Sequence, residues 1–121
     1  MNTPARLLLV QASHELRTYT QQLLEEIGLY NVVGCPSAPQ ALELIAAAKA
    51  KKSPFEIVLC HQGEATNALE LLRAAEDARI YVVSQEDDPR NLSLAASLGL
   101  RRILFTPYGK EELAALLEAT S

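Results

Sequence analysis

Residues 55–63 read FEIVLCHQG, and their pattern decides how the chain folds. The run Ile57–Cys60 is apolar without the alternation that a strand with one solvent-exposed face shows. Such a run is typical of a strand buried on both faces, as in a parallel sheet covered by helices. His61 and Gly63 follow at once, so the strand delivers a histidine to its carboxyl end. The first question is whether His61 carries chemistry.

The same pattern recurs along the chain. A short apolar segment, a polar break and an amphipathic helical segment follow one another five times. The segments are rich in Val, Ile, Leu and aromatic residues, which favour strands. The five predicted strands are Arg6–Val10, Tyr30–Gly34, Phe55–Cys60, Ile80–Val83 and Arg101–Phe105.

A helix is predicted after each strand. Ser13 and Ser37 are suited to cap the first two helices, and Gly28 to end the first. The remaining helices are expected to begin near Thr66, Asp88 and Lys110. Five strand–helix units joined by right-handed crossovers form a doubly wound α/β sandwich of three layers. We therefore expect one flavodoxin-like domain over residues 1–121, with a parallel five-stranded sheet of order 2-1-3-4-5.

Composition narrows the function classes. The 121 residues are 49% hydrophobic and 21% charged, which is ordinary for a globular domain. The net charge of −4 argues against a nucleic-acid-binding surface. The amino-terminal apolar run is too short for a signal peptide or a membrane span. Cys35 and Cys60 fit reduced interior thiols. We expect a cytoplasmic protein with no nucleic-acid or membrane partner.

In a doubly wound sheet, function is located at the carboxyl ends of the strands. Four loops are predicted to meet there: Val10–Ser13, Cys60–Gly63, Ser84–Asp88 and Phe105–Tyr108. The segments LLLVQAS, FEIVLCHQG, IYVVSQ and GLRRILFTPY that lead into them resemble those of a bacterial response-regulator receiver domain of the CheY-like kind. The resemblance covers the chain from Arg6 to about Glu118, and it implies the same fold and a place in two-component signal transduction or a phosphorelay.

The resemblance also implies where the family's chemistry would lie. A receiver holds Mg²⁺ with an acidic pair, phosphorylates an aspartate, and binds the phosphoryl oxygens with a hydroxyl and a lysine. The corresponding positions here are Gln11 and Ala12 for the acidic pair, His61 for the aspartate, Ser84 for the hydroxyl, Thr106 for the lysine and Pro107 for the proline after it. Only the serine and the proline keep the family's residue type. We expect a vestigial phosphorylation pocket with no catalytic residue and no bound Mg²⁺, and a cis Thr106–Pro107 bond.

Other roles for His61 are less well supported. A phosphohistidine would need phosphoryl-binding groups that the sequence does not show. Cys60 and His61 are neighbours on a strand, so their side chains should point to opposite faces and not form a nucleophile pair. A metal site with His14 would have few further ligands. The favoured interpretation is a histidine that fills the space of the lost aspartate, and the chain is not predicted to be an enzyme.

If the pocket has lost its chemistry, a surface must carry the function. The predicted function is a pseudo-receiver that acts as a protein interaction or dimerisation module independent of phosphorylation. Its partner would be a second copy, through the fourth helix, fifth strand and fifth helix, or another signalling domain. The expected face carries Arg90, Arg101, Arg102, Tyr108, Glu111 and Glu112. The alternative is a sensor that binds an anion or nucleotide between Gln11, His61, Ser84 and Thr106.

Overall fold

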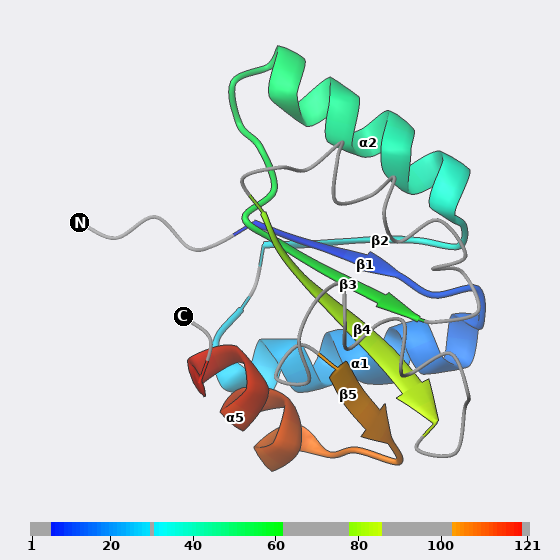
Figure 1. Cartoon of the computed structure of the whole chain (residues 1–121), viewed down its shortest axis with the longest axis vertical. Coiled ribbons are helices and arrows are strands. Elements are labelled where there is room, and N and C mark those ends of the chain that lie inside the picture. Colours follow the sequence, from blue (N-terminus) through cyan, green and yellow to red (C-terminus); the bar gives the residue numbers. More distant parts are fainter. Residues whose placement is uncertain (1–5, 30, 62–77, 86–102, 120–121) are drawn as a thin grey trace.

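A computed structural model describes residues 6–29, 31–61, 78–85 and 103–119. These residues form a parallel five-stranded sheet of order β2-β1-β3-β4-β5, which confirms the predicted topology (Figure 1). The strands are β1 Leu7–Val10, β2 Val32–Cys35, β3 Ile57–His61, β4 Arg79–Gln85 and β5 Ile103–Thr106.

Helices cover both faces of this sheet, as predicted. The described helices are α1 His14–Ile27, α2 Ala38–Ala50 and α5 Lys110–Ala119. Figure 1 shows α2 on one face of the sheet and α1 and α5 on the other, which gives three layers. The helices predicted to begin at Thr66 and Asp88 lie outside the described residues. None of the described helices is long and apolar enough to cross a membrane.

The predicted caps account for the helix ends. Ser13 Oγ accepts a hydrogen bond from the Leu16 N–H at 3.3 Å, and so satisfies one of the amides that begin α1. Ser37 Oγ accepts from the Gln40 N–H at 3.4 Å in the same way at α2. Gly28 ends α1 with a φ of 110°, a left-handed conformation that glycine adopts without a steric penalty.

Four strands extend further than predicted at their carboxyl ends: β2, β3, β4, which ends at Gln85, and β5, which ends at Thr106. β2 includes Cys35, whose carbonyl accepts a hydrogen bond from the Gln11 N–H at 3.0 Å and so continues the ladder with β1. β3 includes His61, which pairs with Val83 of β4. β2 and β3 also begin two residues later than predicted. Gln11 and His61 therefore stand at the same carboxyl edge of the sheet.

The core is split by the alternation of side chains along each strand. In β3, Val58 and Cys60 pack with the residues of α2, whereas Ile57 and Leu59 pack with those of α1 and α5. Because both faces are covered, the central strands are apolar throughout, as the stretch FEIVLC predicted.

Candidate functional site

A cavity of about 550 Å³ opens at the carboxyl edge of the sheet, on the side of α1 and α5. It is lined by Leu16, Tyr19, His61, Thr106, Pro107 and Tyr108. Three of the six residues of the predicted vestigial pocket, His61, Thr106 and Pro107, thus line one cavity. Gln11 and Ser84 are buried at the same edge, and Ala12 is exposed.

Gln11 is bound within its own loop. Its side chain is 6% exposed, and its Oε1 accepts a hydrogen bond from the Ser13 N–H at 3.2 Å. A buried amide oxygen held by a backbone donor is satisfied where it lies. The oxygen at this position is thus engaged by the protein itself.

Arg17 places a cation beside Gln11, a feature that sequence reasoning missed. Its guanidinium donates to the Gln11 carbonyl oxygen at 2.8 Å and lies 3.3 Å from His14 Nδ1. Its stem crosses Gly34, where an added Cβ would come within 3.1 Å of the Arg17 Cδ. A glycine inside a strand often marks such a close approach, so Gly34 was the available signal.

His61 and Cys60 point to opposite faces of the sheet. The Cys60 side chain is buried in the core beneath α2, whereas His61 is partly exposed and lines the cavity beside α1. The thiol donates to the His61 carbonyl oxygen at 3.5 Å and not toward the imidazole. Among the described residues, no three His, Cys, Asp or Glu side chains gather as metal ligands would.

Comparison with known proteins shows which solved structures share this fold. No protein-family model and no curated protein matches the sequence. Solved structures do match over nearly the full length. CheY4 of Vibrio cholerae, a chemotaxis response regulator, is 21% identical with a TM-score of 0.74, over 98% of this chain and 100% of that one. A response regulator receiver domain protein from Clostridium thermocellum is 16% identical with a TM-score of 0.77, over 95% and 92%.

The chain has the receiver fold. A third match, a putative pilus assembly protein (CpaE) from Burkholderia thailandensis, has a TM-score of 0.75 and 19% identity over 97% of this chain and 99% of that one. The expected cis bond is also present, between Thr106 and Pro107. The resemblance thus led to the correct fold and to this loop geometry.

The loop that follows β5 of the receiver fold is held against α1 by two tyrosines. Tyr19 Oη donates to the Tyr108 carbonyl oxygen at 2.9 Å, and the two rings lie 6.3 Å apart between centroids. The Tyr108 hydroxyl lies 2.6 Å from Thr20 Oγ1. Tyr108, which belongs to the interaction face expected from the sequence, is therefore half-buried, with its hydroxyl turned into the protein.

This burial makes stability depend on pH in the alkaline range. Burial, opposed by the Thr20 hydrogen bond, raises the pKa of the Tyr108 hydroxyl above its ordinary value of about 10. The folded state therefore holds this proton more tightly, and its contribution to stability is present below pH ~10 and lost as pH rises through the higher folded pKa. We expect denaturant unfolding of Tyr108→Phe to show a weaker loss of stability above pH ~10 than the wild type. Equal losses of stability above pH ~10 in Tyr108→Phe and in the wild type would contradict this prediction.

The charged face predicted for dimerisation is only partly described. Glu111 and Glu112 are exposed in the first turn of α5, and the Glu112 carboxylate accepts the Gly109 N–H at 3.1 Å. Acidic groups here also suit the helix dipole. Arg90, Arg101 and Arg102 lie outside the described residues, so their pairing with these glutamates stays a prediction.

Proposed function

We propose that the protein is a pseudo-receiver, an interaction module of bacterial signal transduction that works without phosphorylation. The observation that carries the proposal is the Arg17 guanidinium, hydrogen-bonded to the Gln11 carbonyl at the end of β1. In a working receiver this is the edge at which carboxylates hold Mg²⁺.

Electrostatics and ligand chemistry both support a loss of the metal site. Mg²⁺ prefers carboxylate oxygens in octahedral geometry, whereas Gln11 offers a neutral oxygen already bound to Ser13 and Ala12 offers none. Arg17 adds a positive charge that opposes a second cation nearby. His61, in the place of the aspartate, has no carboxylate with which to form an acyl phosphate.

An interaction role is supported by the surface around the cavity. Leu16 and Tyr19 are the large hydrophobic side chains most exposed among the described residues, at 49% and 44%. Both line the cavity beside Tyr108, so apolar surface and a hollow coincide. Exposed aromatic groups at a concave site are typical of protein contacts. The partner would be a second copy or another signalling domain, and no cofactor is expected.

The decisive experiment offers the protein the reagents that a working receiver accepts. With Mg²⁺ and beryllofluoride or acetyl phosphate, we expect no change in amide chemical shifts and no added phosphoryl mass. The variant Gln11→Asp/Ala12→Asp rebuilds the acidic pair and is expected to show Mg²⁺-dependent shifts near β1 that the wild type lacks. Phosphoryl transfer to the wild type, or Mg²⁺ shifts equal to those of the variant, would overturn the proposal.

A ligand sensor is the second candidate, and the cavity is the observation that favours it. A volume of about 550 Å³ suits a small molecule. Its walls are mainly Leu16, Tyr19, Pro107 and Tyr108, which suit an aromatic compound better than the anion or nucleotide first considered. Shift changes confined to this cavity on titration with small aromatic compounds would favour the sensor over the interaction module.

A further inference from the structure

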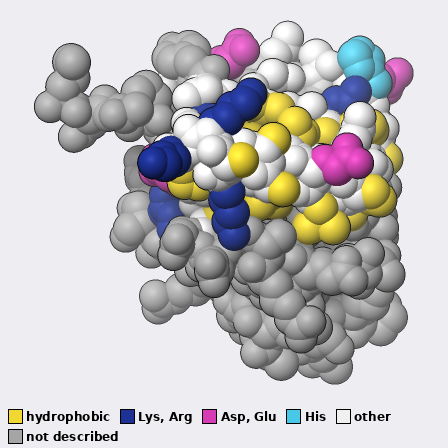
Figure 2. All heavy atoms as spheres, turned by 90° about the horizontal axis from the view of Figure 1, so that it is seen from above, with side chains coloured by type: hydrophobic (Ala, Val, Ile, Leu, Met, Phe, Trp, Pro, Cys, Tyr) yellow, Lys and Arg dark blue, Asp and Glu magenta, His cyan; other side chains and the backbone are white. Residues whose placement is uncertain are grey.

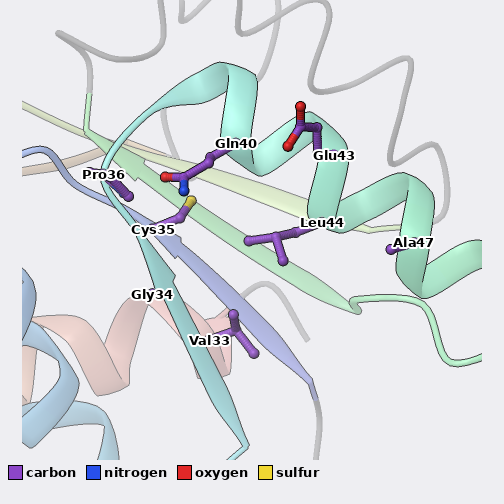
Figure 3. Close-up of a pocket in the computed structure, with 8 residues that line it drawn as sticks. All are labelled: Val33, Gly34, Cys35, Pro36, Gln40, Glu43, Leu44 and Ala47. Carbon is purple, nitrogen blue, oxygen red and sulfur yellow. The ribbon is translucent and has the colours of Figure 1, made fainter.

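A second hollow lies on the α2 face of the sheet, between α2 and β2 (Figure 3). It has a volume of about 440 Å³. Val33 and Cys35 of the strand and Leu44 and Ala47 of the helix supply its apolar surface, with Gln40 and Glu43 from the helix as its polar lining. In Figure 3, Leu44 and Val33 point into the space between helix and strand, and the Glu43 carboxylate projects away from the strand.

The strand beside this groove is an edge of the sheet. β2 has β1 as its neighbour on one side and no described strand on the other. The carbonyls of Asn31 and Cys35 accept hydrogen bonds from β1. Backbone direction alternates along a strand, so the N–H and C=O groups of Val32 and Gly34 point outward, away from β1.

This edge lacks most of the usual protection against pairing. Natural edge strands are kept from adding another chain by short length, charged residues, prolines or bulges. β2 is short, at four residues, but it reads VVGC, with no charge and no proline inside it. Its outward groups therefore remain available for hydrogen bonds, and the adjacent groove offers apolar surface.

We propose that a second copy of this chain pairs with β2 in antiparallel orientation, about a two-fold axis beside Val33. In that register Val32 of each copy stands opposite Gly34 of its mate, and their outward N–H and C=O groups bond to one another. The two sheets become one, and the groove of each copy is closed by the edge of the other. The β2 edge would then be one of the faces through which the interaction module proposed above binds a partner.

The charges on α2 support a second copy of the chain as the partner that covers the groove. The axis brings both α2 helices onto the same face of the joined sheet and makes them antiparallel. Glu43 of one helix then faces the carboxyl-terminal half of the other, where Lys49 is exposed. Figure 2 looks down on α2 and shows hydrophobic side chains across the middle of this face, with most cations toward one side. An isologous contact of this kind pairs opposite charges twice.

The test is sedimentation equilibrium of the whole chain and its variants. We expect the wild type to form a dimer, and Gly34→Pro, which removes an outward N–H and leaves the ladder with β1 intact, to dimerise at least about tenfold more weakly. Gly34→Ala is the matched control: it brings the same Cβ near Arg17 but keeps the N–H, so it should dimerise as the wild type does.

The exposed charges give a second test that does not risk the fold. Glu43→Lys and Lys49→Glu should each weaken the dimer severalfold, and the double variant should restore it. A monomeric wild type, a dimer unaffected by Gly34→Pro and by the charge variants, or a dimer lost equally in Gly34→Ala would overturn the proposal. These outcomes are independent of the Mg²⁺ and beryllofluoride experiment, so failure here is distinguishable from failure of the pseudo-receiver proposal.

Discussion

Replacing Leu59 by alanine is expected to lower the free energy of unfolding by about 2–5 kcal/mol. Leu59 is 0% exposed in β3, between β1 and β4, and packs in the cluster formed with α1 and α5. Truncation removes the buried methyl groups and leaves a void that the surrounding sheet closes only in part. Denaturant unfolding monitored by circular dichroism measures the loss.

Leu16→Ala provides the control for this experiment. The same side chain is removed from a site where 49% of it is exposed, so we expect a change within about 0.5 kcal/mol. A loss below about 1 kcal/mol for Leu59→Ala would contradict a strand buried on both faces. Comparable losses of stability for Leu59→Ala and Leu16→Ala would also contradict a strand buried on both faces.

The contrast between these leucines shows why the fold could be predicted from the sequence. The run Ile57–Cys60 is apolar at every position, which is typical of a strand that a covered parallel sheet buries on both faces. The caps Ser13 and Gly28 are set by local geometry, so they too could be predicted without the tertiary structure. The strand order could be predicted because successive strand–helix units with right-handed crossovers allow only a few arrangements of the sheet.

The site was predicted only in part, for physical reasons. Gln11 and His61 could be predicted to lie at one edge of the sheet, because each stands at the carboxyl end of a strand and the two strands are parallel. Arg17 escaped notice because its role depends on a close approach to Gly34 in a strand distant in sequence. The bond between Thr20 and Tyr108 joins residues that are 88 positions apart, and neither residue type predicts such a partner. Side-chain contacts of this range depend on packing that a sequence pattern does not contain.

The Thr20–Tyr108 contact leads to the second large expected effect. Thr20 is 1% exposed, and its Oγ1 lies 2.6 Å from the Tyr108 hydroxyl. Thr20→Val keeps the shape of the side chain and removes the hydroxyl, so the half-buried phenol loses a partner that water replaces poorly. We expect a loss of about 1–3 kcal/mol in the free energy of unfolding.

A double-mutant cycle separates this bond from packing. Tyr108→Phe removes the other partner, and in the double variant Thr20→Val/Tyr108→Phe neither polar group is left unsatisfied. The double variant should therefore be more stable than the sum of the two single losses implies, with a coupling energy of about 0.5–3 kcal/mol. Tyr19→Phe removes the neighbouring hydrogen bond to the Tyr108 carbonyl, which does not involve the phenol of Tyr108, and serves as the comparison. Additive losses in the cycle would mean that the hydroxyls do not stabilise the loop after β5 against α1, and that the cavity wall formed by Tyr108 is held by ring packing alone.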